Sequence, residues 1–187
     1  MLMLDDVSFF LSLVMQTEEE RKSTLKDEVA SIEAGVFFII QLYIFMYYYD
    51  FQGVELLRWI GWLLFIPGFL FITLATTALR KHGLPEEGKG WVFTTVLVQQ
   101  GVYGIIRHPF ALGWSILTVA LALVSQFWLS IFCMIIQIPL IIFDIIHEEE
   151  TNMQTFGPDY FSYQTHVPMM NFLAGLRLYL KKWRAKI

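Results

Sequence analysis

Long apolar runs are the feature that most restricts what this 187-residue chain can fold into. An α-helix rises about 1.5 Å per residue, so a run of roughly 20 apolar residues crosses a bilayer core of about 30 Å. Four runs of nearly this length occur, with very few charges inside them: 32–49, 56–79, 109–124 and 127–146. They predict an all-α, polytopic membrane protein with about four transmembrane helices.

The composition excludes several other classes of protein. Hydrophobic residues make up 56% of the chain and charged residues only 16%, against about 25% charged in soluble domains. Such a chain is not intrinsically disordered, and its net charge of -4 argues against a nucleic-acid partner. The single cysteine, Cys133, lies in an apolar run, where we expect a buried thiol rather than a disulfide.

We interpret residues 1–187 as one membrane-embedded domain. The residues from Met169 onward alternate apolar and basic side chains at helical spacing, which predicts an amphipathic helix on the membrane surface. Whether residues 1–16 span the membrane or lie on it stays open. The domain has four parts: an N-terminal interfacial segment (1–31), two spans (32–80), a core segment (81–168) and an amphipathic basic tail (169–187).

Lysine and arginine set the expected orientation. Four spans place the N-terminal segment, the polar loop 80–108 and the C-terminal tail on one side, and this side holds nearly every Lys and Arg. By the positive-inside rule it is cytoplasmic, whereas residues 50–55 and the Ser125–Gln126 turn lie outside.

Two polar clusters flank the helical hairpin (109–146). Arg107 and His108 precede it, and Glu148 and Glu149 follow it. A hairpin brings its two ends together, so we expect these side chains to meet at the cytoplasmic interface. Such ion pairs can also serve only to neutralise charge at a membrane boundary.

The histidines do not predict a metal site. His147 and Glu148 are adjacent and project about 100° apart on a helix, unlike the i,i+3 or i,i+4 pairs of helical metal sites.

The spaced motifs of the second half resemble those of the isoprenylcysteine carboxyl methyltransferase and phospholipid methyltransferase group of integral membrane enzymes. The resemblance covers about residues 95–168 and is vague over the first two spans. It is carried by Gly101-Val102-Tyr103, Arg107-His108-Pro109, Gly113, Glu148-Glu149, Phe156-Gly157, Tyr160, Tyr163 and Val167-Pro168.

The resemblance implies methyl transfer from S-adenosylmethionine bound in a cytoplasmic pocket, which makes 81–168 the catalytic core. It implies catalytic roles for Arg107, His108 and Glu148. The implied cofactor-binding residues are Thr95, Val96, Leu97, Val98, Gly101, Tyr103, His108, Pro109, Glu148 and Glu149.

The chemistry of these residues suits that cofactor. Glu148 or Glu149 can bind its ammonium group, and Arg107 or His108 can bind its carboxylate together with backbone N–H groups. Tyr103 can form a wall beside the sulfonium. Methyl transfer needs no nucleophilic side chain, and the choice of a base among His108, His147 and a glutamate stays open.

Two departures from the family pattern concern the methyl acceptor. Ala111 stands where members commonly have tyrosine, and Asp144 stands where enzymes acting on prenylated cysteine have arginine. Asp144 suits a cationic or hydrogen-bond-donating acceptor, or is a polar residue at a helix end. Tyr160 and Tyr163 either anchor the interface or line a substrate path, which completes the candidate substrate-binding set of Ala111, Asp144, Tyr160 and Tyr163.

The acceptor is expected to be a lipophilic small molecule or a lipid entering from the bilayer: a carboxylate, an amine, a thiol or an isoprenoid. Two other functions compete. Membrane sterol reductases that use NADPH carry similar Arg-His-Pro segments, although the spacing from Glu148-Glu149 to Phe156-Gly157 favours the methyltransferase. A non-catalytic membrane scaffold would use the same charges only as an interfacial ion-pair layer.

Overall fold

The structure is a computed structural model that describes residues 35–47, 53–84 and 94–184. Several sequence predictions therefore lie outside the described residues. These are the N-terminal segment 1–31, both ends of the first span, the loop residues 85–93 and the end of the tail, 185–187.

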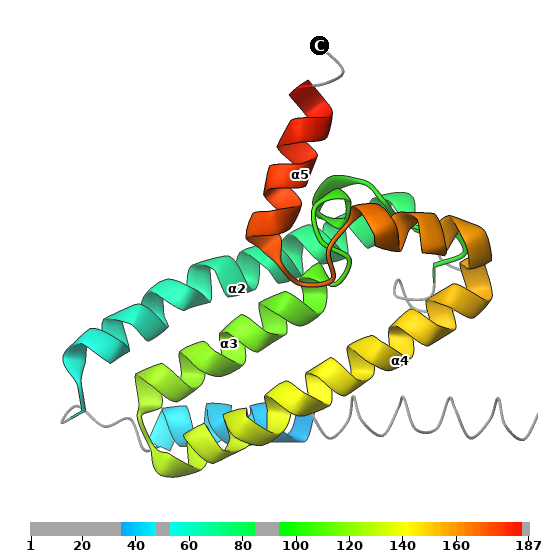
Figure 1. Cartoon of the computed structure of the whole chain (residues 1–187). Coiled ribbons are helices and arrows are strands. Elements are labelled where there is room, and N and C mark those ends of the chain that lie inside the picture. The colour runs from blue at the N-terminus through cyan, green and yellow to red at the C-terminus, as the bar shows by residue number, and fades with distance from the viewer. Residues whose placement is uncertain (1–34, 48–52, 85–93, 185–187) are drawn as a thin grey trace, which may run out of the picture.

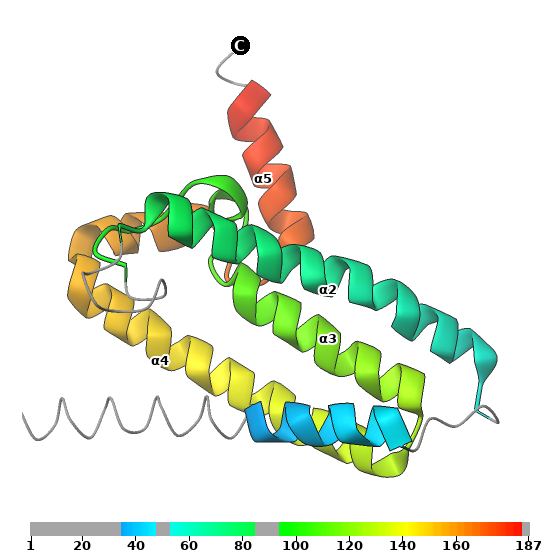
Figure 2. The same cartoon turned by 180° about the vertical axis from the view of Figure 1, so that it is seen from behind.

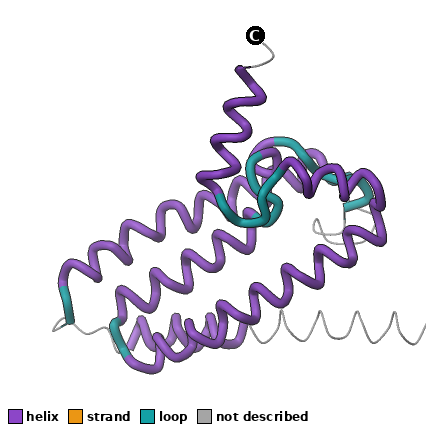
Figure 3. The backbone as a smooth tube through the Cα atoms, viewed as in Figure 1, coloured by secondary structure: helices purple, strands orange, loops and turns teal. Residues whose placement is uncertain are grey.

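The described chain consists of helices joined by loops, which confirms the predicted all-α class (Figure 3). A first helix covers Gly35–Tyr47. The elements that follow are α2 (Glu55–His82), the short 3-10 helix η1 (Gly101–Gly104), α3 (Pro109–Ser125), α4 (Trp128–His166) and α5 (Phe172–Arg184).

Two helices, α2 and α4, are long and apolar enough to cross a membrane. The helix Gly35–Tyr47 and α3 are apolar but shorter, and the 17 residues of α3 stand at the lower limit for a span. The hairpin lies where the sequence predicts it, with α3 and α4 joined at Gln126, which adopts a left-handed conformation with φ 48°.

Helix α4 runs further than the apolar pattern indicates. Its 39 residues extend about 20 residues past Ile146, the predicted end, so that only its first half is apolar. The apolar pattern does not mark this extension, because polar side chains alone do not end a helix. The break comes at Gly157, whose φ of 50° and ψ of -124° kink the helix before Pro158.

Glycines allow α2 and α3 to lie side by side (Figures 1 and 2). A Cβ atom on Gly113 of α3 would lie 2.9 Å from the Gly68 carbonyl oxygen and 3.0 Å from the Ile72 amide nitrogen of α2. Gly61 and Gly68 of α2 are as closely packed against α3. Small residues permit such backbone contact, which drives helix association where no hydrophobic effect acts between helices.

Buried amides join the first helix to the hairpin. Gln41 is fully buried and donates a hydrogen bond to the Ser130 carbonyl at 3.0 Å, and Thr118 donates to the Gln137 amide oxygen at 3.1 Å. At the opposite end from η1, the Gln126 side chain bonds both the amide and the carbonyl of Val54, at 2.7 and 2.9 Å. These contacts fix the helices in one register.

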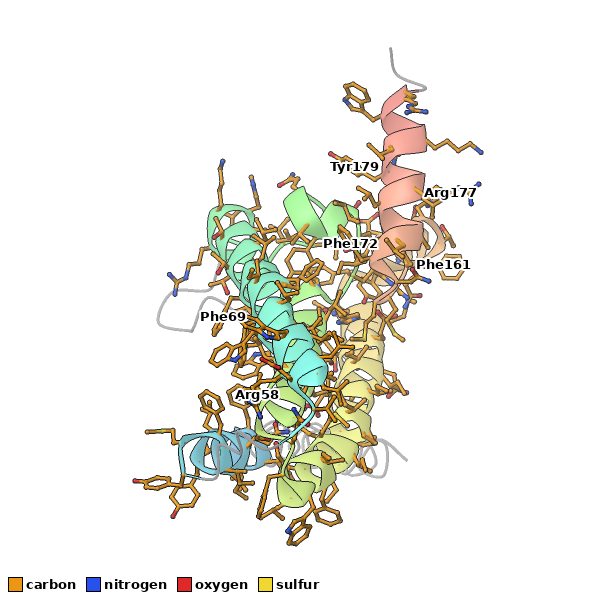
Figure 4. The ribbon with its side chains drawn as sticks, turned by 90° about the vertical axis from the view of Figure 1, so that its left-hand side faces the viewer. Arg58, Phe69, Phe161, Phe172, Arg177 and Tyr179 are labelled. Carbon is orange, nitrogen blue, oxygen red and sulfur yellow. The ribbon has the colours of Figure 1, made fainter. Side chains whose placement is uncertain are left out.

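Helix α5 confirms the predicted amphipathic helix in the tail. It starts against the bundle, where the Phe172 ring meets Phe71 edge to face at 5.2 Å, and then leaves it at a steep angle to α2 and α3 (Figures 1 and 4). A Cβ on Gly175 would collide with the Ile105 carbonyl oxygen, so the first turn of α5 is packed directly on the chain that follows η1.

We expect Gly113→Ala to destabilise the protein, because the new methyl group collides with backbone atoms of α2 that cannot move independently. Overpacking of this kind costs roughly 1–3 kcal/mol. Gly35→Ala is the matched control, since a Cβ there meets nothing within 4 Å. Thermal unfolding in detergent should show a lower midpoint for Gly113→Ala only; equal midpoints would contradict the close packing.

Candidate functional site

The site begins at the turn between η1 and α3. Gly101 has a φ of 63°, which glycine adopts without strain, and the amides of Ile105 and Ile106 both donate to the Val102 carbonyl. This turn ends at Arg107 and at His108, the residue that precedes α3. Pro109 then starts the helix, because a first-turn residue needs no backbone donor.

The segment after α4 holds Arg107 and His108 from the other side. The Arg107 amide donates to the Pro168 carbonyl at 3.0 Å, and the His108 amide donates to the Met169 carbonyl at 3.1 Å. Two stretches sixty residues apart in sequence are thereby joined backbone to backbone.

The Glu149 carboxylate is the centre of the site. One oxygen accepts from His108 Nε2 at 2.6 Å and from the Tyr160 hydroxyl at 2.9 Å. The other accepts from Arg107 Nη1 at 2.5 Å and from the Gln164 amide at 2.6 Å. With four donors, both oxygens of this largely buried carboxylate are fully used.

Glu148 is placed quite differently. Its carboxylate accepts a hydrogen bond from His108 Nδ1 at 3.2 Å, yet 61% of its side chain is exposed. The His108 ring, only 3% exposed, thus lies between the two neighbouring carboxylates. The predicted meeting of Arg107 and His108 with Glu148 and Glu149 is confirmed.

The charges of this cluster stabilise one another. Burial lowers the pKa of His108, but hydrogen bonds to Glu148 and Glu149 outweigh this effect and raise the pKa to about 9. Burial raises the pKa of Glu149, but hydrogen bonds from His108 and Tyr160 and the charges of His108 and Arg107 lower it to about 2. At neutral pH the site contains an imidazolium ion between two carboxylates.

Three tyrosines, Tyr103, Tyr160 and Tyr163, lie next to this cluster. Tyr163 is buried and donates its hydroxyl to the Tyr103 carbonyl at 2.7 Å, and its ring lies 5.8 Å from that of buried Tyr160. Burial raises the pKa of all three phenols, helped by the nearby charge of Glu148 at Tyr103 and by a bond to Glu149 at Tyr160. Both α4 tyrosines face inward, so they are not exposed anchors at an interface.

The other predicted site residues occupy varied positions. Thr95 is exposed and its hydroxyl donates to the Leu84 carbonyl at 2.7 Å. Val98 is buried, and Ala111 is half-buried in the first turn of α3. Val96 is 44% exposed, and Leu97 is half-buried. Asp144 is half-buried one helical turn before Glu148.

Sequence reasoning missed Gln164 and the two backbone acceptors. Gln164 follows Tyr160 by four residues and so shares its helix face, which was the signal available in the sequence. No sequence pattern marks the carbonyls of Pro168 and Met169, because every residue has one.

Some bonding capacity in the cluster remains open. Among the described residues, the buried Nε of Arg107 has no hydrogen-bond partner. The Glu148 side chain, which contacts His108, is 61% exposed. The cluster therefore contains one buried N–H donor without a partner and one carboxylate that is largely exposed.

The fold and this cluster together define an all-α membrane protein with a charged site at one end of a helical hairpin. A family model described as phospholipid methyltransferase matches residues 56–159, more than half of the chain. The chain therefore belongs to the phospholipid methyltransferase family, as the motifs indicate. No curated protein and no solved structure matches it. The family supports a membrane methyltransferase that acts on lipids.

The stability of the protein should fall as the pH rises from about 6.5 to about 9. The pKa of His108 is raised on folding, so its contribution is complete below its ordinary value of 6.5 and is lost as the pH passes about 9. Glu149 acts in the opposite sense, losing its contribution as the pH falls from 4.5 toward about 2.

Thermal unfolding midpoints measured across this range in detergent test the effect. His108→Gln should flatten the alkaline decline, whereas His166→Gln, at an exposed imidazole that contacts the Thr165 hydroxyl and the Ser162 carbonyl, should keep it. If the unfolding midpoint of His108→Gln declined with pH as steeply as that of the wild type, His108 would not be the group whose pKa is raised by the two glutamates.

The two glutamates should differ sharply in their contribution to stability. Glu149→Gln leaves Arg107 and His108 without a buried counter-charge, which costs roughly 3–5 kcal/mol. Glu148→Gln removes one exposed partner and should cost less than about 1 kcal/mol. Free energies of unfolding from denaturant titration in mixed micelles give the comparison, and equal losses would refute the difference between the two positions.

Proposed function

We propose that this protein transfers a methyl group from S-adenosylmethionine to a lipophilic small-molecule or lipid acceptor at the cytoplasmic membrane interface. The observation that carries the proposal is the Arg107–His108–Glu148–Glu149 cluster, which lies within the segment matched by the phospholipid methyltransferase family model. When bound, S-adenosylmethionine supplies a sulfonium-activated methyl group, which a nucleophilic acceptor takes by displacement at carbon.

The residues of the cluster fit this co-substrate. Its amino-acid part is a zwitterion, and the site offers the exposed carboxylate of Glu148 for the ammonium group and the unpartnered Nε of Arg107 for the carboxylate. Glu149 is saturated by four donors, so we assign it the positioning of Arg107 and His108 rather than contact with the ligand. Of the two glutamates that the sequence leaves open, the geometry favours Glu148.

The chain contributes mainly by orientation. Arg107 and His108 are held by side-chain bonds to α4 and by backbone bonds to Pro168 and Met169. A donor and acceptor held in line react as if at very high concentration, which lowers the barrier without any covalent help from the enzyme. His108 is charged at neutral pH because its pKa is about 9, so it is poorly suited to act as the base for a protonated acceptor. That role is left to Glu148 or His147.

Asp144 bears on the class of acceptor. It lies half-buried on α4, four residues before Glu148 and therefore on nearly the same helix face, at the junction with the apolar half. A carboxylate at this depth repels a carboxylate acceptor and attracts a cation. This favours a lipid amine over a prenylcysteine carboxylate, with a thiol or an isoprenoid as the remaining classes.

Calorimetric titration of the detergent-purified protein with S-adenosylmethionine tests the proposal. We expect micromolar binding that weakens about 10- to 100-fold in Glu148→Gln, because a charge-assisted hydrogen bond is lost. Glu150→Gln is the matched control: it removes the same charge two residues further on, from an exposed side chain near His147. If S-adenosylmethionine binds, the next step is a screen of amine, thiol and isoprenoid acceptors.

The same titration separates the competing functions. Binding of NADPH in place of S-adenosylmethionine would support a membrane reductase. Binding of neither by a folded sample would leave only the scaffold and reject the proposal.

A further inference from the structure

A cavity of about 770 Å³ lies beside the charged cluster but is lined by other residues. Its walls come from η1 and the residues before it, from the last turns of α4 and from one side of α5. Tyr163 stands between the two regions, because it lines the cavity and also contacts Tyr160, the partner of Glu149.

The lining of this cavity is basic. Lys181 and Lys182 of α5 are its cationic residues, and none of the described residues around it is acidic. The whole chain carries a net charge of -4, whereas α5 carries Arg177, Lys181, Lys182 and Arg184 and no acid. A local positive potential of this kind attracts an anion.

The remaining lining suits the boundary between water and lipid. Ser162 and Thr165 lie on the α4 side, where the Thr165 hydroxyl donates to the Ser162 carbonyl, and Tyr179 and Trp183 lie on the α5 side. Lysines and a serine hydroxyl hold phosphate oxygens, whereas Tyr and Trp favour the headgroup level of a bilayer.

Helix α5, which forms one side of this cavity, carries exposed apolar side chains. The helix starts beside α2 and projects away from α2 and α3, which are packed along each other (Figures 1 and 2). Leu173 is 78% exposed and Trp183 57% exposed, which leaves apolar area available to lipid. Tyr179 and Arg177 project from opposite sides of α5, and Tyr179 is on the cavity side (Figure 4).

We propose that the cavity between η1, the end of α4 and α5 binds the phosphate headgroup of an anionic membrane phospholipid. Lys181 and Lys182 hold the phosphate, and the aromatic residues of α5 lie at the level of the glycerol backbone. This lipid is a ligand that seats α5 on the leaflet, separate from the methyl acceptor at the Glu148 site.

Native mass spectrometry of the full chain in detergent, with added phosphatidylglycerol, measures the binding. Each cation near an anionic lipid contributes about 1 kcal/mol, so Lys181→Gln/Lys182→Gln should bind roughly thirtyfold more weakly. Arg177→Gln/Arg184→Gln is the matched control: it removes the same two charges from α5 at positions that do not line the cavity, and it should bind nearly as the wild type. Lys181→Arg/Lys182→Arg should restore binding.

Several results would overturn this assignment. Equal weakening in both glutamine variants would mean diffuse attraction to a basic helix, and equal binding of phosphatidylcholine with the same acyl chains would remove the requirement for an anion. Inorganic phosphate binding as tightly as the lipid would make this a site for free anions. Loss of S-adenosylmethionine binding in Lys181→Gln/Lys182→Gln, with phosphatidylglycerol binding intact, would assign the cavity to the co-substrate instead.

Discussion

The burial of one negative charge, that of Glu149, organises the functional end of this protein. An ionised carboxylate removed from water is tolerated only when paired and fully hydrogen-bonded, and Glu149 has four donors within 2.5–2.9 Å. These donors come from the chain before α3 and from α4 beyond its kink at Gly157. Satisfying one carboxylate therefore holds three segments of the chain in a single arrangement.

In this arrangement the two adjacent glutamates, Glu148 and Glu149, have different environments. Consecutive residues on a helix point about 100° apart, so Glu149 turns into the protein while Glu148 stays largely exposed. His108 bridges them and carries the positive charge that makes both carboxylates compatible with each other. Glu149, which is buried and accepts four hydrogen bonds, holds the surrounding segments in place. Glu148 is left with carboxylate surface that is exposed to solvent.

The rest of the bundle supplies a rigid frame for that site. Between helices in a membrane, association depends on close packing and polar contacts, and this protein uses both. Gly68 and Gly113 let α2 and α3 touch at the backbone, and Gln41 ties the first helix to α4. Because α5 packs through Gly175 on the chain that follows η1, the site and the basic cavity share a common support.

The sequence by itself determined the helical class, the hairpin and the meeting of Arg107 and His108 with the glutamates. These follow from apolar length, from proline chemistry and from the antiparallel geometry of a hairpin, all of which are local or topological. Only the tertiary structure decided that Glu149 rather than Glu148 is buried, that Gln164 is its fourth donor, and that α4 continues to His166. Such choices depend on which face of a helix meets a neighbour, and residues far apart in the chain set that face.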